Sequence, residues 1–226
     1  FCDKVKMIGV VGDDFHKEDI EEFKNHGIDT EGLQIKRGEK SFFWAGKYHN
    51  DMNSRDTLAT ELNVLADFDP IIPASYQDCE YLLLGNLTPQ IQQTTIKRLK
   101  KRPKLIVLDT MNFWMDVALP DLLETLKMVD VLTINDAEAR QLSGEYSLVK
   151  AAKKILTMGP QYLIIKKGEH GALLFHNDLI FSAPALPLAE VFDPTGAGDT
   201  FAGGFIGYLT KDGTINFKNM RKAIIL

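Results

Sequence analysis

Short apolar runs alternate with amphipathic segments along most of the chain. The runs are strand-sized and bounded by polar or turn-forming residues, which predicts strands at Met7–Val11, Tyr81–Leu84, Leu105–Leu108, Val131–Ile134, Tyr162–Lys166, Ala172–Phe175 and Leu179–Ser182. The segments between them have helical periodicity or helix boundary signals, which predicts helices at Phe15–His26, Gln90–Lys100, Asp121–Met128, Asp136–Leu142, Leu148–Met158 and Ala197–Leu209. Strands that alternate with helices indicate an α/β fold, with a mostly parallel sheet covered on both faces.

The segment from Gly32 to Asn53 interrupts this alternation. It predicts short strands at Leu33–Lys36, Ser41–Ala45 and Lys47–His49, with turns at Arg37-Gly38 and Ala45-Gly46. Its mixture of aromatic and polar residues is typical of a small β insertion that folds over a ligand. An extra hairpin that pairs with a sheet edge or another subunit is the alternative. We therefore predict a core of residues 1–31 and 54–226 with a β-strand lid at 32–53.

Composition narrows the classes of function. The 226 residues include 26 Lys and Arg against 31 Asp and Glu, a formal charge of −5, which argues against nucleic-acid binding. The apolar runs are too short to span a membrane, and no signal-peptide pattern opens the chain. Two cysteines cannot form a disulfide framework, so we predict a reducing, cytoplasmic location. The chain begins at Phe1 and ends in an apolar run, and we expect both ends to be incomplete.

The strongest chemical signal is the glycine-rich stretch from Asp193 to Phe205. Gly196 and Gly198 permit a tight turn whose backbone N–H groups can approach an anion. The positive N-terminal end of the following helix points at the same place. Asp199 lies in the first turn of that helix, where a carboxylate can act as general base toward a hydroxyl. The spacing alone fits equally well a plain turn followed by a helix-stabilising carboxylate.

This stretch resembles the C-terminal signature of the ribokinase-like (PfkB) carbohydrate and nucleoside kinases, D-T/P-T-G-A-G-D-x-F-x-x-G-F, and every fixed position matches. The resemblance implies a three-layer ribokinase-like sandwich and an ATP-dependent kinase that phosphorylates a hydroxyl of a small molecule. It places the γ-phosphate at the backbone N–H groups of Gly196, Ala197 and Gly198. It makes Asp199 the catalytic base.

Further motifs of the family occur in the same order. Val10 to Phe15 resembles its structural V-G-x-D strand and turn, and Asp109 to Asn112, followed by Trp114, is similar to its D-x-N…W stretch. Asn135 and Glu138 match N-x-x-E. Their spacing also fits a helix cap with its partner at the third position. The resemblance implies that Asn135 and Glu138 organise Mg²⁺, its waters and the ATP phosphates.

The stretch from Lys166 to Gly171 resembles the nucleotide-side turn of the family, T-x-G-x-x-G, with Lys166 at the usual Thr position. The resemblance implies ATP binding by Lys166 and Gly168, and a lysine there can reach a polyphosphate as a point charge. A solvated strand end is the alternative for Lys166. Asp193 and Thr195 match positions that in many family members hold a monovalent cation such as K⁺.

Substrate identity is less constrained. The resemblance places substrate contacts near Asn63, Asn86 and Asn112, and Trp44 in the lid can stack on a sugar or a base. We predict a sugar or sugar derivative as substrate, with a nucleoside as the alternative. A non-catalytic binding protein on the same fold is a second alternative, but it would be expected to lose Asp199 or a glycine of the turn. Family sugar kinases often pair through the lid, which suggests a homodimer.

Overall fold

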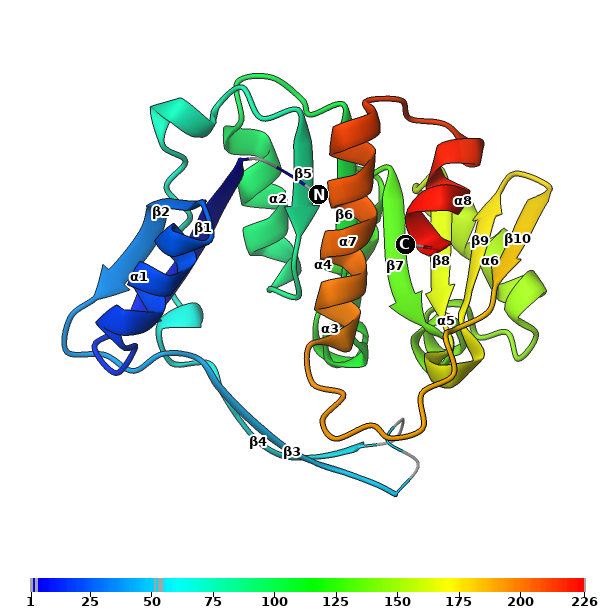
Figure 1. Cartoon of the computed structure of the whole chain (residues 1–226), viewed down its shortest axis with the longest axis horizontal. Helices are drawn as coiled ribbons and strands as arrows, with labels where there is room; N and C mark the ends of the chain where they lie inside the picture. The colour runs from blue at the N-terminus through cyan, green and yellow to red at the C-terminus, as the bar shows by residue number, and fades with distance from the viewer. Residues whose placement is uncertain (1, 3, 51, 53–54, 226) are drawn as a thin grey trace.

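A six-stranded sheet forms the centre of the protein (Figure 1). The computed structural model describes residues 2, 4–50, 52 and 55–225. The sheet has the order β10-β9-β8-β7-β6-β5 and consists of β5 (Tyr81–Leu84), β6 (Leu105–Asp109), β7 (Val131–Asn135), β8 (Tyr162–Lys166), β9 (Ala172–His176) and β10 (Leu179–Ala183). β5 to β8 are parallel to one another, whereas β9 is antiparallel to both of its neighbours, β8 and β10. The predicted α/β fold with a mostly parallel sheet is confirmed.

Helices cover both faces of this sheet, giving three layers (Figure 1). One face packs against α2 (Pro89–Arg98), α3 (Asn112–Val117), α4 (Leu119–Leu126), α5 (Asp136–Ser143) and α6 (Leu148–Leu156). The other face packs against α7 (Ala197–Asp212) and α8 (Phe217–Ile225). Within the described part of the chain, no helix is both long and apolar enough to cross a membrane.

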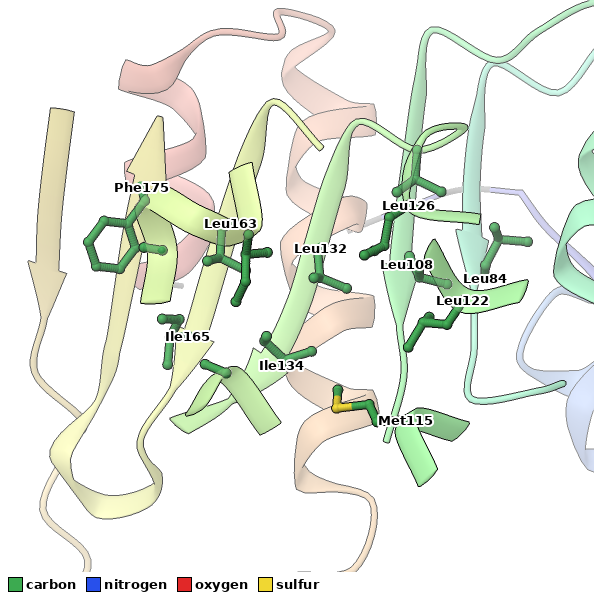
Figure 2. Close-up of a cluster of buried hydrophobic side chains, with 14 of the residues drawn as sticks. Leu84, Leu108, Met115, Leu122, Leu126, Leu132, Ile134, Leu163, Ile165 and Phe175 are labelled. Carbon is green, nitrogen blue, oxygen red and sulfur yellow. The ribbon is translucent and has the colours of Figure 1, made fainter. Parts of the chain in front are cut away.

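The central strands contribute to two cores at once. In β6, Ile106 and Leu108 pack into the core beneath α3 to α6, which Figure 2 shows around Leu108 and Leu132. Leu105 and Val107 point to the opposite face and pack with helices α7 and α8. Successive side chains of a strand point to opposite faces of a sheet. A strand covered on both faces therefore needs an unbroken apolar run, as the sequence of β6 has.

β1 (Val5–Gly12) corrects the prediction that Met7–Val11 is a buried strand. It pairs in parallel with β2 (Ile28–Lys36) in a separate two-stranded sheet, with α1 (Lys17–Asn25) between them in the chain. In β1, Gly12 is buried and the other residues are partly or fully exposed. Ile8 and Val10 pack against a small cluster around Phe68 and Ile91. Residues 7–11 nevertheless all remain partly exposed, so the apolar run is incompletely covered.

The second two-stranded sheet is an antiparallel hairpin of β3 (Phe43–Tyr48) and β4 (Arg55–Glu61), called the hairpin below. The predicted turn at Ala45-Gly46 is wrong, because β3 continues through it with a shift in pairing. The ring of Trp44 fills the space that a side chain at Gly46 would need. Residues 33–36, predicted as a separate strand, are the end of β2. The predicted boundary at residues 53 and 54 lies outside the described residues, and the division into core and lid stays a prediction.

The turn after β1 has the structural role expected of its motif. The Gly12 N–H donates to Ser41 Oγ at 2.9 Å, and the Ser41 N–H donates to Asp14 Oδ1 at 2.7 Å. The hydrogen bonds that Asp14 accepts from Ser41 lower the pKa of this exposed carboxyl. A Cβ at residue 12 would collide with the backbone of residues 39–41. The turn therefore anchors the chain segment that leads into the hairpin.

Truncating a central core side chain should destabilise the whole domain. Leu132 in β7 is fully buried, so we expect Leu132→Ala to lower the free energy of unfolding by about 2–5 kcal/mol. Leu186→Ala is the matched control, because Leu186 is 82% exposed and should change stability by less than about 0.5 kcal/mol. Urea denaturation followed by circular dichroism measures both. Equal losses in the two variants would contradict the assignment of this core.

Candidate active site

Three neighbouring parallel strands end in polar residues at one edge of the sheet. β6 ends at Asp109, β7 at Asn135 and β8 at Lys166. Asn135 lies opposite Lys166 in the strand register, and Asp109 lies opposite Thr133. In open α/β sheets, ligands bind outside the carboxyl ends of the strands. This edge is therefore the candidate site.

Lys166 and Asp109 form a largely buried ion pair at this edge. The Lys166 Nζ donates to Asp109 Oδ1 at 3.0 Å, and the two side chains are 19% and 11% exposed. The Thr133 hydroxyl donates to the same oxygen at 2.9 Å. The sequence places Asp109 in the D-x-N…W stretch but predicts no individual role for Asp109 or Thr133. The available signal was a carboxylate directly after a fully apolar strand, because such a group needs a partner once it is buried.

Asn135 and Glu138 form the capping box that their spacing predicted. The Asn135 Oδ1 accepts from the Glu138 N–H at 2.8 Å, and the Glu138 Oε2 accepts from the Asn135 N–H at 2.7 Å. The pair satisfies two backbone donors that the start of a helix otherwise leaves without partners. It fixes the first turn of α5 against the carboxyl end of β7.

Glu138 is 6% exposed, and burial raises its pKa to about 7. The hydrogen bond from the Asn135 N–H opposes this shift, as do the positive charges of Lys166 and Arg55. The negative charge of Asp109 adds to it. Burial dominates because a carboxylate loses its hydration there. Glu138 thus lies within the electrostatic reach of β6, β8 and the hairpin.

The glycine-rich turn brings the start of α7 to the same edge. Gly196 caps the helix with a φ of 78°, a left-handed conformation that glycine adopts without strain. The Ala197 N–H donates to the Pro194 carbonyl at 3.1 Å. The first-turn N–H groups of Gly198 and Asp199 have no acceptor within their own helix. A Cβ on Gly198 would lie 3.1 Å from the Lys166 Nζ, so the lysine reaches the turn.

The acidic residues of this turn are exposed to solvent. Asp199 lies in the first turn of α7, as predicted. Asp193 Oδ1 accepts from the Thr195 N–H at 2.9 Å, and its hydrogen bonds with Thr195 lower the Asp193 pKa. This local turn brings together the two residues predicted to hold a monovalent cation. Their binding of a cation stays a prediction, as do the catalytic role of Asp199 and the anion-binding role of residues 196–198.

The predicted nucleotide-side turn follows Lys166 directly. Gly168 begins the short 3-10 helix η3 (Gly168–His170) with a φ of 54°. The Lys167 N–H donates to the Gly171 carbonyl at 2.8 Å and closes the turn. Lys166 is therefore held at the end of β8, opposite Asn135, and Gly168 lies in the turn directly after it. Their contact with ATP stays a prediction.

The hairpin passes under the loop that leads into α7 (Figure 1). The Thr195 hydroxyl donates to Tyr48 Oη at 3.3 Å, which links the end of β3 to the glycine-rich turn. Trp44, a predicted substrate contact, packs along the hairpin itself, where its Nε1 donates to Thr57 Oγ1 at 3.3 Å. Tyr48 and Arg55 were not identified from the sequence, because the order of residues does not reveal where the hairpin reaches.

The three asparagines predicted to contact substrate are dispersed. Asn63 donates to the Ser41 carbonyl at 2.8 Å and holds together the two chain segments at the base of the hairpin. Asn86 follows β5, and its Oδ1 accepts from the Trp114 Nε1 at 2.8 Å. Asn112 is exposed at the start of α3. Asn86 and Asn112 therefore flank the sheet edge near α3, whereas Asn63 has a structural contact away from it.

The buried Glu138 should make stability depend on pH. Its pKa of about 7 in the folded protein lies above the ordinary glutamate pKa of 4.5, so folding favours its neutral form. The free energy of unfolding of the wild-type protein should therefore fall as pH rises from 4.5 through 7, where Glu138 becomes charged in its buried position. In chelator-containing buffer, Glu138→Gln should be the more stable protein at pH 8, by on the order of 3 kcal/mol, with little difference at pH 4. Parallel pH profiles in urea denaturation would contradict this prediction.

The chain is similar to known kinases over nearly its whole length. Residues 2–223 match the pfkB family carbohydrate kinase description. The cytidine kinase of Thermococcus kodakarensis is 31% identical over 210 residues, which cover 91% of this chain and 74% of that kinase. The ribokinase of Lactococcus lactis is 26% identical over 223 residues, covering 98% and 71%.

The fold is also similar to that of an E. coli protein described as ribokinase II, solved with ATP and Mg²⁺. The TM-score is 0.74 at 21% identity, covering 97% of this chain and 74% of that one. This likeness concerns the fold alone. The family match over nearly the whole length, together with the 31% identity to a cytidine kinase of which 74% is covered, establishes that the chain belongs to the pfkB family of carbohydrate kinases.

Proposed function

We propose that this protein transfers the γ-phosphoryl group of ATP to a hydroxyl of a small sugar or sugar derivative. The observation that carries the proposal is the meeting of Lys166 with the glycine-rich turn. The Lys166 Nζ lies 3.1 Å from the position that a Cβ on Gly198 would take, at the carboxyl edge of the sheet. A lysine ammonium beside the N-terminal turn of a helix is suited to bind a phosphate group.

In this proposal, the chain supplies positioning and charge stabilisation. The first-turn N–H groups of α7 and the Lys166 ammonium stabilise the negative charge on the transferred phosphoryl group. Asp199 accepts the proton of the substrate hydroxyl while the oxygen of that hydroxyl attacks the γ-phosphorus of ATP. The bond between the γ-phosphorus and the bridging oxygen breaks, and ADP leaves with that oxygen. The exposed position of Asp199 beside the turn leaves room for a substrate hydroxyl. Gly168 and Asn135 flank the polyphosphate.

The residues present fit Mg²⁺. No group of three His, Cys, Asp or Glu that could hold a metal occurs among residues 2, 4–50, 52 and 55–225. Magnesium in phosphoryl-transfer sites is held by one or two carboxylates together with substrate phosphates and water. Glu138 and Asn135, assisted by Asp109, would hold the ion on this arrangement. Bound there, Mg²⁺ supplies neutralisation of phosphate charge. A K⁺ ion near Asp193 and Thr195 is a further part of the proposal.

A nucleoside is the second candidate substrate. The chain is more similar to the cytidine kinase than to the ribokinase described above, with 31% against 26% identity. Stacking by an aromatic side chain such as Trp44 suits a base and a sugar face alike. The proposal extends to cytoplasmic action, where ATP is available, and to a homodimer formed through the hairpin. The exposed apolar side chains of Phe42, Phe43 and Leu58 support such pairing.

Removing the proposed base should abolish turnover without unfolding the protein. Asp199 is exposed, so we expect Asp199→Asn to retain the melting temperature and ATP affinity. Activity should fall by about 100-fold or more, the typical contribution of a general base. ADP release with Mg²⁺ and K⁺, over a panel of sugars, sugar acids and nucleosides, measures this effect and identifies the substrate class. Near-wild-type turnover in the variant would exclude the role.

Two glycines of α7 form a matched pair for testing the phosphate site. Gly198→Ala places a methyl group 3.1 Å from the Lys166 Nζ and should weaken ATP binding at least about tenfold, equivalent to about 1.4 kcal/mol. Gly203→Ala meets nothing within 4 Å and should leave ATP binding unchanged. Both variants gain helix propensity, so stability should not distinguish them. Isothermal titration calorimetry gives the comparison, and equal ATP affinities would contradict the proposed site.

A further inference from the structure

A buried glutamine joins a helix to the carboxyl ends of two strands. Gln92, on α2, is 1% exposed, and its side-chain amide donates to the Gly85 carbonyl at 2.8 Å and to the Asp109 carbonyl at 3.4 Å. Gly85 directly follows β5, and Asp109 is the last residue of β6. β5 and β6 are parallel neighbours, so one side chain holds both strand ends at the edge that carries the candidate site.

The two carbonyls belong to different sides of that site. Gly85 precedes Asn86, a predicted substrate contact. The carboxylate of Asp109 accepts hydrogen bonds from the Lys166 ammonium and the Thr133 hydroxyl. Asp109 is thus held through its carboxylate by β7 and β8, and through its main chain by α2. The placement of the lysine ammonium therefore depends in part on the glutamine.

This arrangement leaves one polar atom of Gln92 without a partner. The two carbonyls fix the orientation of the amide, because only its NH₂ group can donate to them. The Oε1 atom then points elsewhere, and among residues 2, 4–50, 52 and 55–225 it has no hydrogen-bond partner. An unpartnered buried oxygen offsets the stability that the amide hydrogen bonds contribute. Methionine has a similar size and helix propensity without this cost, so stability alone does not account for a glutamine here.

We propose that Gln92 is a positioning residue for phosphoryl transfer, which sets the end of β5 on the substrate side relative to the end of β6 on the phosphate side. This inference rests on the proposed function. Gln92 acts through Asp109, whose carboxylate holds the Lys166 ammonium beside Gly198. Two reacting groups must be held in a defined geometry, so a shift of either strand end impairs the reaction although Gln92 itself contacts no ligand.

The test removes the amide and keeps the volume of the side chain. In Gln92→Met, Asp109 loses its bond from α2, so the lysine ammonium is held less closely. We expect Mg²⁺ with the non-hydrolysable analogue AMP-PNP to bind about fivefold or more weakly, as measured by titration calorimetry well below the melting temperature. With the acceptor found in the substrate panel, kcat should fall by about tenfold or more and the acceptor KM should change by less than about threefold.

Gln92→Asn is the second variant. Its amide sits on a stem one methylene shorter and cannot hold both carbonyls from the same place on α2. It retains a polar side chain in the same packing, and its nucleotide affinity should change in the same direction.

Two neighbouring residues provide matched controls. Gln93, the next residue of α2, donates from its amide to the Asp121 carbonyl at 2.9 Å and so joins α2 to α4 instead of to the sheet edge. Thr110 follows Asp109 and is buried, but its hydroxyl has no partner within the described part of the chain. Gln93→Met and Thr110→Val should both keep AMP-PNP affinity within about twofold of wild type.

The outcomes separate this inference from the proposed function. A lower melting temperature in Gln92→Met with unchanged AMP-PNP affinity would mean a purely structural role, overturning the positioning role and leaving the kinase proposal standing. Equal losses of affinity in Gln93→Met or Thr110→Val would also overturn it, because any disturbance of α2 or of the end of β6 would then suffice. Wild-type protein that binds no AMP-PNP would contradict the proposed function and the role of Gln92 with it.

Discussion

Strands β6, β7 and β8 are covered on both faces by apolar side chains, and a charged group placed between those layers would lose its hydration without compensation. Polar chemistry is therefore confined to the strand ends. Asp109, Asn135 and Lys166 are the last residues of their strands. The turn that begins α7 reaches the same edge, because a Cβ on Gly198 would lie 3.1 Å from the Lys166 Nζ. The candidate site thus follows from the burial of the sheet.

The ion pair between Lys166 and Asp109 shows how a charge is retained at such a place. Removing one partner of a largely buried pair typically costs about 3–5 kcal/mol, whereas the intact pair adds little net stability. The ion pair instead fixes the position of the lysine ammonium. Asp109 and Thr133 hold the lysine ammonium beside Gly198, where a phosphate would need it. The capping box of Asn135 and Glu138 fixes the neighbouring helix start in the same way.

The hairpin is positioned by individual hydrogen bonds, whereas the sheet is positioned by a buried core. A two-stranded hairpin is marginally stable by itself, and the residues of β3 and β4 are partly or fully exposed. Its position depends on a few specific contacts: the Asn63 bond to the Ser41 carbonyl at its base, and the bond between Thr195 and Tyr48 near its end. The hairpin is therefore held by far fewer apolar contacts than the closely packed sheet, whose strands are covered on both faces.

The sequence by itself determined the central strands, most helices, the capping box and the glycine-rich turn, because each depends on residues close together in the chain. It also identified Lys166 and Gly198 separately as candidate phosphate contacts. Only the tertiary structure decided that these two meet, that Asp109 balances the lysine, and that Tyr48 of the hairpin contacts Thr195. It also decided that β1 lies outside the central sheet and that Ala45-Gly46 is no turn. Local patterns fix periodicity and caps, whereas the pairing of distant segments depends on how strands and helices pack once the chain has folded.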